Sequence, residues 1–295
     1  MEENQAVVVI TGMHRSGTSL TASLLQSAGI FIGDRLMAGG TGNAKGHFED
    51  WDFVDLHREF LTAKSVNREG WTSQSNFTLS GEYLERAKSL IAARSQYAIW
   101  GWKDPRTTLF LESWRDLIPH AKFVFVYRSP WDVVDSLFRR GDLIFKTDPE
   151  IAIQTWISYN QTILDFCNST SQPWILLRIE DVINHPQFIV NSINRQLGIN
   201  LRSPENLYDC SLFKNNTFNL HRARLIQNHY PDAFRLYIKL HQQATLFYKT
   251  QNASVDLIPS QPPWVFQNWL DKPICKVRSM KYWHRLRQLA ISHEG

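Results

Sequence analysis

The sequence has little cysteine, no long apolar run and no large excess of charge of one sign. Only 3 of its 295 residues are cysteines. Cys167, Cys210 and Cys275 are too far apart for a disulfide framework or a Cys-x-x-Cys metal site. No apolar run approaches the roughly 18 residues that would span a membrane, and the apolar stretch at 6–10 is too short for a secretory leader. These absences predict a cytoplasmic protein of enzyme size without a transmembrane segment.

The charge is close to balanced, with 32 Lys and Arg against 28 Asp and Glu, a net charge of +4. Six of the basic residues, and no acids, fall between 272 and 287, so the remainder carries about −2. A nucleic-acid-binding protein carries a basic surface over its folded body, and we therefore expect no nucleic-acid partner. The chain has no His, Cys, Asp and Glu residues at metal-ligand spacing, and we expect no metal. From residue 279 we expect a terminal helix that is either solvated or docked on the body, rather than one that binds a membrane or a partner.

Short apolar runs alternate with amphipathic stretches along the chain. Strands are predicted at 6–10, 97–102, 122–127 and 174–179. Helices are predicted at 18–28, 52–63, 82–93, 109–117, 131–140, 149–166, 186–197 and 231–248. Apolar strands that alternate with helices are typical of parallel sheets covered on both faces. The predicted fold is α/β, a three-layer P-loop-like parallel sheet with helices on both faces.

No repeat or linker divides the chain. We therefore predict a single domain over 1–295, with a core at about 6–200 and a helical C-terminal portion at about 201–295.

A glycine-containing loop, GMHRSGTS at 12–19, joins the first predicted strand to the first helix. The backbone N–H groups of such a loop, together with the N-terminus of the next helix, bind anions. The spacing matches the nucleotide-binding pattern GxxxxGK[ST], except that Thr18 stands at the lysine position. The nearest cation is Arg15. We therefore expect an anion site but not ATP or GTP hydrolysis.

The segment HRSGTS resembles the phosphosulfate-binding loop of sulfotransferases. A second segment, YRSPWDVVDSL, places Arg128 at the end of a predicted strand, eight residues before Ser136. Sulfotransferases bind the 3′-phosphate of their donor with an arginine and a serine at this separation. A third segment, LLRIEDVINHPQ at 176–187, resembles a late strand and helix of the same family. The resemblance covers residues 6–200 and is nearest to the carbohydrate-type or tyrosylprotein-like branch.

The resemblance implies a donor co-substrate, 3′-phosphoadenosine 5′-phosphosulfate, and no metal. The residues that it assigns to donor binding are Arg15, Ser16, Gly17, Thr18, Ser19, Arg128 and Ser136. Their positions agree with elementary chemistry, because guanidinium and hydroxyl groups bind phosphate. They also follow strands whose carboxyl ends meet at one edge of a parallel sheet, where ligands of such folds bind.

The resemblance also suggests catalytic residues. Glu49, in KGHFED, follows the first helix, where several sulfotransferases have a glutamate base; His47 is the first alternative and Asp50 the second. Another interpretation makes Glu49 an acid at the start of the next helix. Lys103, in KDPR, corresponds to a lysine near the leaving oxygen, and Arg15 is expected to share its work. We read Asp104 and Arg106 as a local ion pair that sets the turn.

The predicted function is transfer of a sulfuryl group to a hydroxyl or amine of an acceptor. The acceptor is expected to be a carbohydrate or another small molecule, because the HRSGTS loop with a later glutamate resembles the carbohydrate-type branch. Two alternatives stay open: a kinase that uses ATP and magnesium, and a nucleotide-binding protein without catalysis.

Overall fold

The computed structural model describes residues 5–39, 46–204, 220–250 and 277–292. Four strands form one parallel sheet: β1 (Ala6–Thr11), β2 (Ile99–Lys103), β3 (Lys122–Tyr127) and β4 (Trp174–Arg178). Their order across the sheet is β2-β1-β3-β4. Because β1 is interior, it pairs with β2 on one side and with β3 on the other. The segments that follow these three strands therefore begin side by side at one edge of the sheet.

Alternate strand residues enter two separate cores. In β1, Val7 and Val9 pack into one core, and Val8 and Ile10 pack into the other. The strands are apolar on both faces because helices cover both, as is usual in parallel sheets. One face is covered by α1 (Thr18–Ser27), α8 (Ile179–Asn184) and α9 (Pro186–Leu197).

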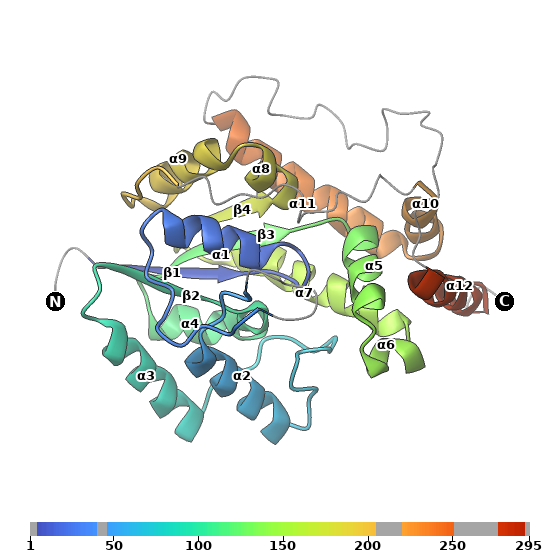
Figure 1. Ribbon diagram of the computed structural model, residues 1–295, viewed down its shortest axis with the longest axis horizontal. Coiled ribbons are helices and arrows are strands. Elements are labelled where there is room, and N and C mark those ends of the chain that lie inside the picture. The colour runs from blue at the N-terminus through green and yellow to red at the C-terminus, as the bar shows by residue number, and fades with distance from the viewer. Residues whose placement is uncertain (1–4, 40–45, 205–219, 251–276, 293–295) are drawn as a thin grey trace.

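The larger core lies on the opposite face of the sheet. Helices α2 (Trp51–Ala63) and α3 (Glu82–Arg94) lie on the other side of the strands from α8 and α9 (Figure 1). The other elements that enter this core are η1 (Pro105–Phe110), α4 (Leu111–Leu117), α5 (Pro130–Arg140), α6 (Leu143–Thr147), α7 (Glu150–Ser169), α10 (Leu220–His229), α11 (Pro231–Thr250) and α12 (Val277–Ser292). The three-layer α/β fold predicted from the sequence is confirmed.

Several predicted boundaries differ from the structure by one to three residues, and two predicted elements change type along their length. The strand predicted at 174–179 ends at Arg178, and Ile179 begins α8. Of the helix predicted at 109–117, residues 111–117 form α4, and the first two residues end a 3₁₀ turn, η1, that starts at Pro105. The turn begins early because the Asp104 side chain accepts a hydrogen bond from the backbone N–H of Arg106, and Pro105 suits the first helical position.

The C-terminal helix α12 docks on the body of the protein, which is one of the two arrangements expected from the sequence. Its apolar residues Trp283, Leu286 and Ala290 are buried, and the helix packs against α5 and α10. The Trp283 indole N–H donates to the Asp135 carboxylate of α5 over 3.2 Å. Among the described residues, no helix is long and apolar enough to span a membrane.

Candidate active site

The loop between β1 and α1 approaches its neighbours so closely that two of its positions require glycine. A Cβ on Gly12 would lie 2.2 Å from the carbonyl oxygen of Val126, and one on Gly17 would lie 2.2 Å from Cδ1 of Ile179. Gly17 also has φ of 96°, in the left-handed region. The loop is thus pressed between β3 and the start of α8, and α1 begins directly after it at Thr18.

Two further features of this loop are typical of a ligand site. Arg15 has φ of 67°, a left-handed conformation that L-residues adopt at a cost of about 1–2 kcal/mol. The Ser16 hydroxyl is buried and has no hydrogen-bond partner among the described residues. Because buried polar groups are usually satisfied, this hydroxyl is suited to an incoming ligand.

The loop contacts the second motif through a hydrogen bond. Nε of Arg15 donates to Oγ of Ser136, on α5, over 2.9 Å. Arg128, directly after β3, is buried nearby, and its Nε lies 4.0 Å from the Asp132 carboxylate. The structure therefore brings together residues separated by more than a hundred positions in the sequence.

Other arginines surround Arg15. Burial, and after it the charges of Arg140, Arg128 and Arg139, lower the pKa of Arg15 to about 10. Cations gathered in this way are stabilised by an anion between them. The remaining predicted donor residues, Thr18 and Ser19, lie in the first turn of α1, where Thr18 is buried and Ser19 is half-buried.

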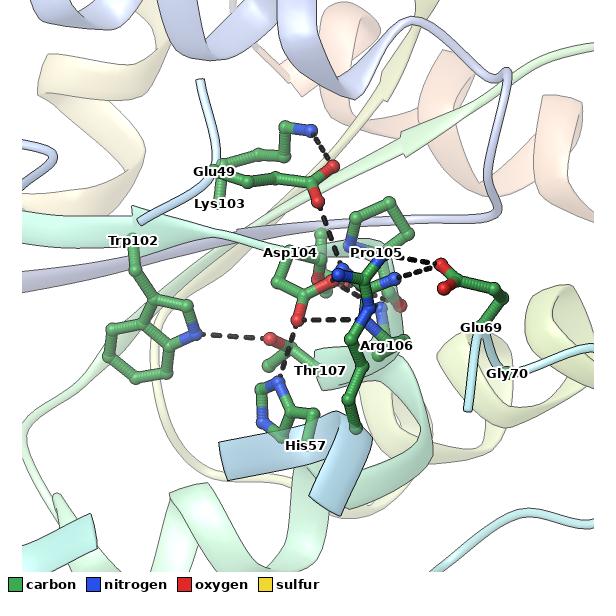
Figure 2. Close-up of polar contacts among 12 residues, drawn as sticks. Glu49, His57, Glu69, Gly70, Trp102, Lys103, Asp104, Pro105, Arg106 and Thr107 are labelled. Carbon is green, nitrogen blue, oxygen red and sulfur yellow. Dashed lines mark hydrogen bonds and ion pairs between the residues drawn. The ribbon is translucent and has the colours of Figure 1, made fainter. Parts of the chain in front are cut away.

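A second polar cluster lies at the ends of β1 and β2. Lys103 is the last residue of β2 and pairs in register with Ile10 of β1. Its Nζ lies 2.6 Å from Oε1 of Glu49, while an Arg106 nitrogen lies 2.9 Å from Oε2 of the same carboxylate (Figure 2). All three side chains are buried. The structure thus brings together Glu49 and Lys103, which lie 54 positions apart in the sequence.

The two clusters share the same edge of the sheet. Oγ1 of Thr11, where β1 runs into the loop, donates to the backbone carbonyl of Asp104 over 2.9 Å. His14 of the loop is buried with its ring 4.5 Å from that of Trp71. Burial lowers the pKa of His14 well below its usual value, and the charge of Arg106 lowers it further. The glutamate and lysine therefore lie beside the loop that carries Arg15.

The side chains of the Glu49–Lys103 pair are buried from solvent. Burial lowers the pKa of Lys103, and the charge of Glu49 and the hydrogen bond to it act in the opposite direction. A buried carboxylate that accepts hydrogen bonds on both oxygens is oriented for proton transfer once one of these bonds is released. A lysine ammonium beside it is suited to neutralising charge that develops on an oxygen.

The alternatives to Glu49 occupy different environments. His47 is half-buried, and burial lowers its pKa, opposed by the charge of Glu49. Asp50 caps α2 by accepting from the backbone N–H of Asp52, and it pairs with Arg94. The acid at the start of α2 is therefore Asp50, which has this structural role, while the Glu49 side chain points to Lys103 and Arg106. Of the glycine-rich segment before Glu49, residues 40–45 lie outside the described residues.

The sequence interpretation of Arg106 was incomplete. It does pair with Asp104, but it also pairs with Glu49 and Glu69. One feature of the sequence could have indicated that Arg106 belongs to the site: it lies three residues after Lys103, on a turn that begins with proline. No local pattern indicated Glu69 or His57, because both approach this site only through the tertiary fold. In the described residues no group of three or more His, Cys, Asp or Glu side chains is arranged to hold a metal.

Comparison with known proteins identifies the class. A model of the sulfotransferase family matches residues 7–204, more than half of the chain. The protein therefore belongs to the sulfotransferase family. No curated protein matches the sequence.

Several solved structures are similar to this chain. The sulfotransferase domain from the curacin biosynthetic pathway is 14% identical, with 97% of this chain and 98% of that chain covered and a TM-score of 0.44. The sulfotransferase domain of the Synechococcus PCC 7002 olefin synthase is 16% identical, with 96% and 94% covered and a TM-score of 0.41. Sulfotransferase STF1 from Mycobacterium tuberculosis H37Rv is 14% identical, with 74% and 73% covered and a TM-score of 0.42.

Proposed function

We propose that this protein transfers a sulfuryl group from 3′-phosphoadenosine 5′-phosphosulfate to a hydroxyl or amine of an acceptor. The observation that carries the proposal is the buried Glu49–Lys103 pair, 2.6 Å apart, at the sheet edge that also carries the Arg15 loop. A base and a cation at the site of an anion-binding loop are the groups that such a transfer requires.

The residues present fit this donor. Arg15, Ser16 and the first turn of α1 would hold the 5′-phosphosulfate, with Gly17 allowing the close backbone approach. Arg128 and Ser136 would hold the 3′-phosphate. The arginine charges around Arg15, which together with burial lower its pKa, and the buried Ser16 hydroxyl support this assignment. When bound, the donor supplies the sulfuryl group and a phosphate leaving group.

The chain's own residues supply the rest of the chemistry. The Glu49 carboxylate accepts the proton of the acceptor hydroxyl or amine, which makes the acceptor oxygen or nitrogen a better nucleophile. The Lys103 ammonium stabilises negative charge on the bridging oxygen as it leaves, and the Arg15 guanidinium shares this charge. His47 is the alternative base, since it lies close enough for the charges of Glu49 and Lys103 to act on it.

For the acceptor we propose a carbohydrate or another small molecule, and for the location the cytoplasm. Both rest on the sequence: the acceptor on the HRSGTS loop with a later glutamate, and the location on the three widely spaced cysteines. Acceptor sites are built from loops that vary between relatives on a common scaffold, so the acceptor is best found by screening once donor binding is established.

Ligand-dependent thermal stabilisation tests the proposal. A ligand that binds only the folded state raises the melting temperature as its concentration exceeds the Kd. We expect adenosine 3′,5′-bisphosphate to stabilise the protein without magnesium, at a concentration where ADP and ATP do not. Arg128→Ala should abolish this shift, while Arg195→Ala, on α9, is the control that should keep it.

Two results would contradict the proposal. A magnesium-dependent shift with ATP, without one for the bisphosphate, would favour the kinase alternative. Bisphosphate binding without any turnover of the phosphosulfate donor, in a screen of sugars, phenols and amines, would favour a nucleotide-binding protein without catalysis.

A further inference from the structure

Arg106 is the most constrained side chain of the candidate active site. It is 1% exposed, and its guanidinium contacts three carboxylates (Figure 2). One terminal nitrogen lies 2.9 Å from Glu49, the other lies 3.1 Å from Glu69, and Nε donates to Asp104 over 3.2 Å. A planar guanidinium bound on three sides has no alternative rotamer that keeps these bonds. Arg106 is therefore fixed in place before any ligand arrives.

A second set of hydrogen bonds fixes Asp104, and thereby Arg106. The Trp114 indole nitrogen, which can only donate, lies 3.1 Å from Nε2 of His57, so Nε2 accepts and the ring proton is on Nδ1. Nδ1 lies 2.8 Å from Oδ2 of Asp104 and donates to it. Burial raises the pKa of Asp104, but the Arg106 charge and the His57 hydrogen bond outweigh this and hold it well below its usual range. Asp104 is thus a buried, charged anchor for Arg106.

Lys103 is held differently. Its ammonium contacts the Glu49 carboxylate at Oε1, the oxygen that Arg106 does not contact. A lysine is a point charge on a flexible stem, whereas an arginine is a rigid fork. The two cations on Glu49 are therefore unequal, because Arg106 is anchored by two further carboxylates and Lys103 is able to turn to another anion.

We propose that Arg106 is a positioning residue. It holds Oε2 of Glu49 while the Lys103 ammonium leaves Oε1 and contacts the donor instead. This inference rests on the proposed function and extends it to a single atom, since Oε1 is then the oxygen that accepts the acceptor proton. In the transfer, the acceptor oxygen forms its bond to sulfur and the bond from sulfur to the bridging oxygen breaks. The electron pair of that bond leaves with the phosphate, and the acceptor proton moves to Oε1.

Two cations, Lys103 and Arg106, contact the single carboxylate of Glu49, and the two have different roles in this proposal. With Lys103 alone, the carboxylate would lose its only partner when the lysine turned away, and it would be free to rotate. A misplacement of about 1 Å in a reacting group costs about 100-fold in rate. With Arg106 in place, the carboxylate keeps its orientation, and the loss of the neighbouring ammonium makes it a stronger proton acceptor.

Arg106→Met and Arg106→Lys test the proposal against a control, Arg58→Met. Arg58 pairs with the same Glu69, over 2.8 Å, so the control removes a cation from the same network. Water serves as the acceptor probe: release of radiolabelled sulfate from the phosphosulfate donor is followed from pH 6 to 9. Melting temperature and bisphosphate affinity are measured in parallel.

We expect Arg106→Met to lower kcat about 100-fold and to move the acid limb of the pH–rate profile to higher pH, with bisphosphate affinity unchanged. Arg106→Lys keeps the charge but not the fork, and should lower kcat about 10-fold with the acid limb in place. Arg58→Met should leave kcat and the profile unchanged. A merely structural role of Arg106 would lower the melting temperature without moving the acid limb.

A wild-type kcat and pH profile in a folded Arg106→Met protein would overturn the proposal. If that variant does not fold, Arg106→Lys decides: a wild-type kcat overturns the proposal, and the partial loss supports it. Failure of the proposed function is distinguishable, because the wild-type protein itself would then neither bind the bisphosphate nor release sulfate from the donor.

Discussion

At the scale of single residues, the candidate active site is an arrangement of buried charges. Glu49 lies between Lys103 and Arg106, and each of the three is compensated by at least one neighbour of opposite sign. Removing one member of a buried pair costs about 3–5 kcal/mol, because the other member is left uncompensated. These residues are therefore coupled in stability as well as in the proposed chemistry.

Glu49→Gln separates binding from catalysis. The amide keeps the shape of the side chain and one acceptor oxygen but accepts a proton poorly. We expect unchanged bisphosphate affinity and a turnover number lowered by about 10²–10⁴, measured by isothermal titration and by sulfate release from the donor. Glu59→Gln is the control, since Glu59 forms a surface pair with Arg86. A wild-type turnover number in Glu49→Gln would contradict the base assignment and favour His47.

At the scale of elements, the anion-binding loop depends on contact between segments that are distant in sequence. Gly17 directly precedes α1, and the side chain packed against it, Ile179, is the first residue of α8. The sequence predicted the strand, the loop and the helix from local signals: an apolar run, glycines, and leucines at helical spacing. It did not indicate that α8 begins at Ile179, because the apolar run 174–179 has no local break between strand and helix.

Gly17→Ala and Gly29→Ala form a matched pair that tests this contact. Both glycines have positive φ, 96° and 114°, but a Cβ on Gly29 meets nothing within 4 Å. Gly29→Ala should therefore cost only the backbone strain, about 1 kcal/mol. Gly17→Ala adds the overlap with Ile179, about 1–3 kcal/mol more, and should weaken bisphosphate binding. Urea denaturation measures both costs, and equal values for the two variants would contradict the packing described here.

At the scale of the whole molecule, the C-terminal helix completes the larger core. The Asp135 carboxylate that receives the Trp283 N–H also pairs with Arg222 of α10, over 2.8 Å. Helices α5, α10 and α12 are thus joined around one buried acid, next to Ser136 in the sequence. The single-domain organisation over 1–295 stays a prediction.

Trp283→Ala tests whether α12 is integral to the fold. Trp283 is buried, and truncating a buried tryptophan costs about 3–5 kcal/mol. Met280, on the same helix, is 53% exposed, so Met280→Ala should change the free energy of unfolding by less than about 0.5 kcal/mol. Chemical denaturation of both variants checks the difference. A small effect of Trp283→Ala would mean that α12 is not docked in solution.

Local patterns in the sequence were enough to predict the fold class, the four strands, the loop, and the places of Arg128 and Ser136 along the chain. These follow from local patterns, since apolar runs, glycine positions and helical periodicity act over a few residues. Which charged side chains contact one another became visible only in the folded protein. Glu49, Glu69 and the segment that carries both Lys103 and Arg106 lie far apart in the sequence, and their contacts depend on strand order and helix packing, which no local pattern encodes. A buried charge is stable only beside an opposite charge, and that partner is set by which segments the fold packs together and not by sequence proximity.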